Sequence, residues 1–170
     1  MHCLRIKINI AKKALSIAEY ASSSPNYFKE LTQCFLSNEY RLAQRAAWSV
    51  SWAARKKPEL VKPYIKDLVA QLSRTDVHNA VIRNSVRVLE EINIPEELHG
   101  DVMNVCFAFI EKPSTPVAIK AFSLTTLFNL SKFYPEVENE LKLIIENNWD
   151  NETAAFKSKG KKILQLLQKN

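Results

Sequence analysis

Five side chains within residues 41–55 have the types and the spacing of a binding surface. They are Arg41, Arg45, Trp48, Trp52 and Arg55, separated by 4, 3, 4 and 3 residues. At about 100° per residue, this spacing places all five within one narrow arc of an α-helix. Guanidinium groups beside indole rings can stack on bases, contact phosphates or anchor a protein partner. The alternative is that the tryptophans pack on a flanking helix while the arginines reach past them to water.

Basic residues recur in two later segments that correspond to this helix. Arg83 and Arg87 fall within residues 76–92, and Lys120 falls within residues 115–133. In residues 115–133 the arc that corresponds to the stripe of residues 41–55 is apolar, which favours the packing alternative there. The candidate binding residues are therefore Arg41, Arg45, Trp48, Trp52, Arg55, Arg83, Arg87 and Lys120.

The sequence does not indicate catalysis, a metal site or a cofactor site. The histidines and cysteines are His2, His78, His99, Cys3, Cys34 and Cys106. None of them forms the paired spacing that places two metal ligands on one helical face or in one turn. Cys34 and Cys106 fall on apolar stripes, so we expect them to be small buried side chains. The two glycines, Gly100 and Gly160, are too far apart for a phosphate-binding loop. We therefore expect a protein that is not an enzyme.

Composition limits the class of protein and its compartment. The 170 residues are 46% hydrophobic and 25% charged, as in a soluble globular chain of one domain over residues 1–170. The net charge of +6 fits an acidic partner without requiring one. The cysteines are isolated and odd in number, which favours a reducing cytoplasm. No run approaches the roughly 20 apolar residues of a membrane span, and Lys12 and Lys13 interrupt the stretch that a secretory signal requires.

The elements that position these residues form a repeat. Prolines Pro25, Pro58, Pro95 and Pro135 each open an apolar-periodic stretch, at separations of 33, 37 and 40 residues. A small residue precedes each proline by 10 to 12 positions, and a fifth follows near the C-terminus. These small residues are Ala14, Ala47, Ser85, Ser123 and Gly160. From Ala47 the steps are 38, 38 and 37 residues, as expected when one structural unit is repeated. We expect each small residue to mark a close helix crossing.

This spacing predicts four antiparallel helix pairs and a closing helix. The first helices are expected near residues 5–21, 38–55, 76–92, 115–133 and 152–168, and the second helices near residues 25–36, 58–73, 95–111 and 135–148. Their apolar residues recur at i, i+3, i+4 and i+7, which is typical of one buried face. Stacking of successive pairs would cover the remaining apolar faces.

Helix pairs of this length, with a basic or polar residue shortly before a small one, are similar to HEAT repeats. The resemblance is carried by Gln44-Arg45-Ala46-Ala47, Ile82-Arg83-Asn84-Ser85 and Ile119-Lys120-Ala121-Phe122-Ser123. The aspartate often found in the turn of such units is matched loosely by Asn38, Asp76 and Asn151, with Ser114 in the fourth unit. The chain resembles small bacterial HEAT-repeat proteins. That resemblance implies an all-α, right-handed α-α superhelix of about four helix pairs plus a C-terminal helix.

The resemblance also implies that the first helices line a concave, basic surface. We therefore expect a binding or scaffold protein that holds a protein or peptide partner of acidic character. The alternative is nucleic-acid binding on the same face, by resemblance to HEAT-like DNA glycosylases, although no residue here matches their catalytic aspartate. A third hypothesis, an enzyme, would need a pocket that groups His99 with Asp101 or Glu97.

Overall fold

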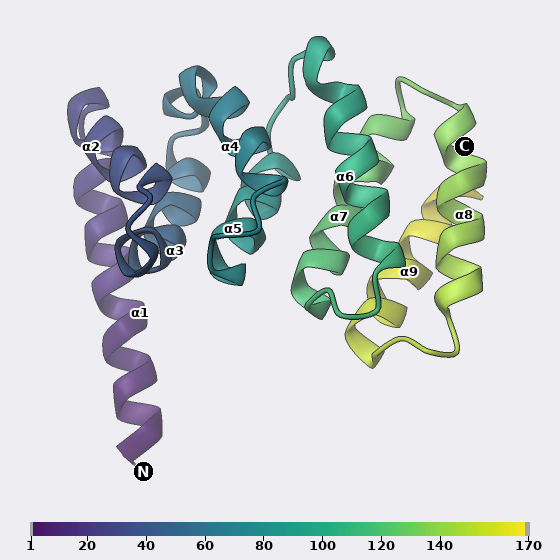
Figure 1. Ribbon diagram of the computed structural model, residues 1–170, viewed down its shortest axis with the longest axis horizontal. Helices are drawn as coiled ribbons and strands as arrows, with labels where there is room; N and C mark the ends of the chain where they lie inside the picture. The colour runs from purple at the N-terminus through teal and green to yellow at the C-terminus, as the bar shows by residue number, and fades with distance from the viewer. Residues whose placement is uncertain (1, 169–170) are drawn as a thin grey trace. The chain divides into compact units, whose positions relative to one another are not determined.

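The computed structural model describes residues 2–168, and side chains from residue 11 onward. Within that part of the chain every regular element is helical (Figure 1). The α-helices are α1 (His2–Ala21), α2 (Pro25–Leu36), α3 (Tyr40–Lys56), α4 (Ile65–Leu72), α5 (Asn79–Leu89), α6 (His99–Glu111), α7 (Val117–Ser131), α8 (Glu136–Asn148) and α9 (Ala154–Leu167). The predicted succession of helix pairs and a closing helix is confirmed.

Local capping chemistry explains where several helices begin. Ser24 precedes α2 and its side chain accepts a hydrogen bond from the backbone N–H of Asn26, while Pro25 opens the helix. Proline is favourable at this position because its missing N–H would lack a partner in the first turn. Thr153 caps α9 in the same way by accepting from the N–H of Phe156.

Three of the predicted helices differ from the structure. The one expected near residues 95–111 starts with a 3₁₀ turn, Glu96–Leu98, before α6. The stretch expected as one helix over residues 58–73 starts with two 3₁₀ turns, Pro58–Leu60 and Lys62–Tyr64, before α4. Pro63 lies within the second turn and has no N–H to continue an α-helical ladder. The helix expected to reach residue 92 ends at Leu89. The Asn129 side chain donates to the Glu90 carbonyl oxygen at 2.9 Å, which satisfies a group that the end of the helix leaves without a partner.

The backbone divides into two compact units, Met1–Val88 and Leu89–Asn170. In the first unit α3 packs against both α1 and α2, and α1 also contacts α2. Ala47 of α3 and Ser85 of α5 are fully buried, and Ala14 of α1 is nearly so. The sequence analysis predicts that these three small residues lie where helices pack against one another, and their burial confirms that prediction.

In the second unit α7 is the central helix and packs against α6, α8 and α9. Leu124 and Leu127 of α7 are fully buried, as are Phe156 of α9 and Ile145 of α8. Gly160 of α9 lies so close to α8 that a β-carbon built there would be 2.9 Å from Cγ2 of Ile145. The small residue is therefore needed for a close helix crossing.

Side-chain contacts repeat with the period of the helix pairs. Five polar contacts join residues that are 32 to 37 positions apart: Glu19–Lys56, Asn38–Arg74, Gln44–His78, His99–Tyr134 and Lys120–Glu152. Each contact links one helix pair to the pair that follows it in the sequence. This sequential pairing is the packing expected of a repeat array.

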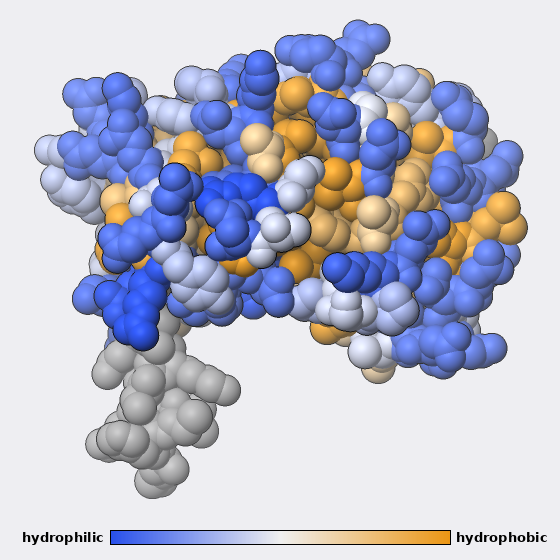
Figure 2. Space-filling view, viewed as in Figure 1, coloured by the Kyte–Doolittle hydropathy of each residue, from blue (hydrophilic) through white to orange (hydrophobic). Residues whose placement is uncertain are grey.

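The surface is mainly hydrophilic on the face shown in Figure 2, with apolar side chains in patches between polar ones. The most exposed large apolar side chains include Phe133, Tyr20 and Leu143. No helix in the described part of the chain is both long enough and apolar enough to span a bilayer.

Candidate binding groove

An open groove crosses the three first helices of the N-terminal unit, where α3 lies between α1 and α5 (Figure 1). Its volume is about 690 Å³. The lining consists of Lys13, Ala14 and Ile17 of α1, of Gln44, Arg45, Trp48 and Ser49 of α3, and of His78, Ala80, Arg83 and Asn84 at the start of α5. We call this set of residues the α1–α3–α5 groove.

Three cations line the groove, and each comes from a different helix. Lys13, Arg45 and Arg83 are all exposed. Their charged groups form no hydrogen bond or ion pair with the described residues, and none of the described lining residues is acidic. By contrast, Arg74 of the same unit is paired with Asp76, at 2.6 Å. The groove therefore carries positive charge that the protein itself does not compensate.

The wall beside these cations is held by hydrogen bonds. Nδ1 of His78 accepts from the backbone N–H of Ala80 at 2.9 Å, so the histidine caps the start of α5. Nε2 of the same ring lies 3.1 Å from Nε2 of Gln44, and the ring meets Tyr40 edge to face at 5.5 Å. Asn84 donates to the carbonyl oxygen of Ala80 at 2.7 Å. The contacts of His78 with Gln44 and Tyr40 join the start of α5 to α3 before any ligand is present.

The predicted stripe on α3 divides into two environments. Trp48 is half-buried and lines the groove together with Arg45. Trp52, one turn further on, lies between two guanidinium groups, with Cζ of Arg55 at 5.5 Å and Cζ of Arg87 at 5.3 Å from its ring centroid. Its indole N–H is buried and has no hydrogen-bond partner among the described residues. Arg–Trp stacking of this kind stabilises the position of both side chains.

The expectation that Lys120 belongs to an exposed basic surface is wrong. Its side chain is only 3% exposed and forms an ion pair with Glu152, which is 11% exposed. The repeat frame explains the difference, because Arg45 and Arg83 precede their small residues by two positions and Lys120 precedes Ser123 by three. One residue rotates a helical side chain by about 100°. Lys120 therefore faces the following repeat.

Sequence reasoning also omitted most of the residues that line the groove. Lys13, Gln44 and His78 were not among the candidates, although all three line the groove. Gln44 precedes Ala47 by three positions, as Lys120 precedes Ser123, and like Lys120 it contacts the following helix pair, here through His78. Arg41 is exposed on α3 but is not one of the lining residues.

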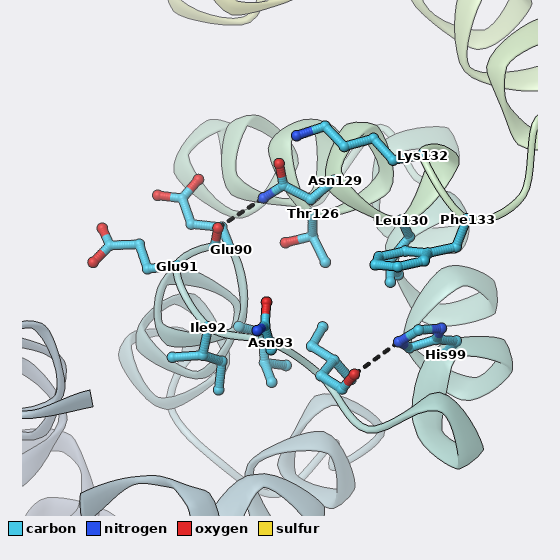
Figure 3. Close-up of a pocket in the computed structure, with 12 residues that line it drawn as sticks. Glu90, Glu91, Ile92, Asn93, His99, Thr126, Asn129, Leu130, Lys132 and Phe133 are labelled. Carbon is cyan, nitrogen blue, oxygen red and sulfur yellow. Dashed lines mark hydrogen bonds between the residues drawn. The ribbon is translucent and has the colours of Figure 1, made fainter. Parts of the chain in front are cut away.

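A smaller cavity of about 300 Å³ lies in the C-terminal unit, between the segment 89–94 and α7 (Figure 3). His99 forms part of its wall and is buried. Nε2 of this ring lies 2.8 Å from the carbonyl oxygen of Ile94, and Nδ1 lies 3.0 Å from the hydroxyl of Tyr134. Because the carbonyl can only accept, Nε2 carries the proton and Nδ1 accepts from the tyrosine. Both nitrogens are thus used to hold the fold, and neither Asp101 nor Glu97 lines the cavity.

Metal ligands are not grouped in the part of the chain that the structure describes. No three His, Cys, Asp or Glu side chains lie close enough there to hold a metal ion. Cys106 is fully buried, and burial raises the pKa of its thiol to about 12. A thiol with so high a pKa is a poor nucleophile near neutral pH.

Charge is distributed unevenly between the two units. Residues 1–88 contain 15 Lys and Arg against 6 Asp and Glu, a net charge of +9. Residues 89–170 contain 9 Lys and Arg against 12 Asp and Glu, a net charge of −3. The positive groove thus lies in the unit that carries the positive charge of the chain.

Comparison with known proteins agrees with this architecture. The model of the HEAT repeat domain matches residues 3–167 of the chain. No curated protein and no solved structure matches the chain. The match runs from the first turn of α1 to the end of α9. The chain therefore belongs to the HEAT repeat domain family.

Proposed function

We propose that this protein is a non-enzymatic binding module whose α1–α3–α5 groove holds an acidic segment of a partner protein. HEAT repeat domains typically serve as protein-interaction scaffolds and are usually non-catalytic. One observation carries the assignment of the surface. Lys13, Arg45 and Arg83 reach the same groove as Trp48 and have no acidic partner among the described side chains.

The chemistry of the groove favours a peptide that carries both negative charge and an apolar side chain. Arginine forms paired hydrogen bonds with carboxylates, and tryptophan and arginine dominate the energetics of protein interfaces. Ile17 of α1 and Ala80 of α5 add apolar surface beside the Trp48 ring. An apolar side chain would bury this surface while flanking carboxylates pair with the cations.

Nucleic acid is the second candidate, favoured by the net charge of +9 on residues 1–88. Phosphates would contact the same cations, and a base could stack on Trp48. The two candidates differ in how they depend on salt. Binding to a nucleic acid releases several counterions, so its affinity falls steeply between about 50 and 200 mM salt.

Fluorescence anisotropy with labelled probes tests the proposal. The probes are a glutamate-rich peptide that carries one phenylalanine, a mixed-sequence single strand and a mixed-sequence duplex. The test variant is Arg45→Ala with Arg83→Ala. The matched control is Lys62→Ala with Lys66→Ala, which removes the same charge from exposed positions outside the groove.

We expect the peptide to bind, and the Arg45 and Arg83 double variant to weaken it roughly tenfold, since each exposed ion pair contributes about 0.2–1 kcal/mol. The control should change affinity by less than about twofold, because its lysines contact no ligand. Equal losses in both variants would show that only net charge attracts the peptide. Tight, steeply salt-dependent binding of a nucleic acid, without peptide binding, would replace this function with the second candidate.

A further inference from the structure

We infer that the groove binds a partner segment whose side chains follow a defined order. A central apolar side chain has one carboxylate on each side, and the segment crosses α1, α3 and α5. This inference rests on the proposed function and makes the partner more specific. It follows from the positions of the cations on the first helices of three successive helix pairs rather than from their number.

The lining residues form three bands across the groove. Lys13 lies on α1 at one side, Arg83 lies on α5 at the other, and Trp48 lies on α3 between them. α3 packs against α1, while the contact between Gln44 and His78 brings the start of α5 beside α3. A ligand that crosses the groove therefore meets a cation, then an indole ring, then a second cation.

The length of the crossing defines the segment. Packed helices such as α1 and α3 lie about 8–10 Å apart, and α5 meets α3 through the contact between Gln44 and His78. An extended chain advances about 3.3 Å per residue, so side chains at i and i+4 are about 13 Å apart. Side chains at i, i+2 and i+4 of an extended chain point to the same face. The pattern that fits is thus acidic–any–apolar–any–acidic.

Arg45 reinforces the central band. It precedes Trp48 by three residues on α3 and lines the groove with it. A carboxylate next to the central apolar side chain, or the backbone carbonyl of the segment, can accept from this guanidinium. The bands contain no described acidic residue that would favour a basic side chain at either end.

Two peptides of the same composition test the order. The first is Gly-Glu-Ser-Phe-Ser-Glu-Gly, and the second is Gly-Phe-Ser-Glu-Ser-Glu-Gly, both with blocked ends. Their net charge and apolar content are equal, so non-specific attraction should contribute equally to the binding of both peptides. Binding is measured by competition against the labelled glutamate-rich peptide, with the full chain and at one salt concentration.

We expect the first peptide to compete roughly three- to tenfold better than the second, because only the first pairs both outer cations while its ring meets Trp48. Equal competition by the two peptides would overturn the inferred order and leave the proposed function intact. If neither peptide competes while the labelled peptide binds, the order is also wrong. Failure of the labelled peptide itself to bind would overturn the proposed function and, with it, this inference.

Charge reversal then tests the two outer positions separately. Lys13→Glu and Arg83→Glu are each combined with peptides in which the first or the last glutamate is replaced by lysine. We expect each variant to prefer a different one of these peptides, roughly tenfold over the original, which also gives the direction of the bound segment. The same preference in both variants would contradict the inferred placement of the cations. Circular dichroism spectra confirm that each exposed substitution leaves the helices intact.

Discussion

Substitution of Gly160 by alanine tests the close crossing of α8 and α9. The new β-carbon would lie 2.9 Å from Cγ2 of Ile145 and 3.5 Å from Cζ3 of Trp149. The first distance is shorter than any stable contact between carbon atoms. Ile145 is fully buried and branched at its β-carbon, so moving this methyl group away requires an unfavourable χ1 rotamer in a packed core.

Two opposing effects set the magnitude. Alanine is favoured over glycine by about 1 kcal/mol inside a helix. Forcing an extra carbon into a packed core costs about 1–3 kcal/mol. We therefore expect Gly160→Ala to lower the free energy of unfolding by about 1 kcal/mol, which corresponds to about 2–4 °C in Tm for a chain of this size.

Urea unfolding followed by far-ultraviolet circular dichroism measures the change. Gly100→Ala is the matched control, because no atom lies within 4 Å of its β-carbon position and neither described glycine has a positive φ. That variant should be more stable by up to about 1 kcal/mol. In an Ile145→Ala background the close contact is gone, so Gly160→Ala should become stabilising there. If Gly160→Ala stabilises the original chain as Gly100→Ala does, then the close crossing of α8 and α9 does not require a glycine at position 160.

Three further predictions concern side-chain pairs and a buried thiol. Lys120→Ala leaves Glu152 without its partner in a mostly buried site and should lower the free energy of unfolding by about 3 kcal/mol, measured by urea titration; an unchanged midpoint would contradict a structural ion pair. Because burial raises the pKa of Cys106 to about 12, iodoacetamide at pH 8 should alkylate Cys34 well before Cys106 in the folded protein, as read by peptide mass spectrometry; equal rates would refute that burial. The hydrogen bond from Lys56 lowers the pKa of Glu19 below its ordinary value of 4.5, so the stabilisation is present above that value and is lost as the pH falls through the lower folded-state pKa. Lys56→Met should remove this part of the acid dependence, and urea midpoints that change with pH identically in both proteins would show that the pair is not responsible.

The repeat frame could be predicted from the sequence because it depends on local chemistry. Prolines and capping side chains determine helix starts, and small residues at constant separation mark the crossings. Ala47, Ser85 and Ser123 are fully buried, as the frame requires. The interruption before α4 was also present in the sequence as Pro63, but its effect on a short helix depends on the packing around it.

The groove could be predicted only in part. Periodicity placed Trp48 and Trp52 on one face of α3, yet their surroundings differ because Arg87 of α5 reaches one ring and not the other. Tertiary packing determines which residues of a neighbouring helix contact a given turn. The spacing of residues within one helix does not predict those contacts. Lys120 is different, because its position three residues before Ser123 already separated it from Arg45 and Arg83.

The uneven charge of the two units has a consequence for the speed of binding. The unit that contains the groove has a net charge of +9, compared with +6 for the whole chain. Long-range attraction of this kind accelerates the encounter with an acidic partner and is screened at distances beyond about 8 Å at physiological ionic strength. Added salt should therefore slow association while leaving the dissociation rate, which depends on contacts inside the groove, much less affected.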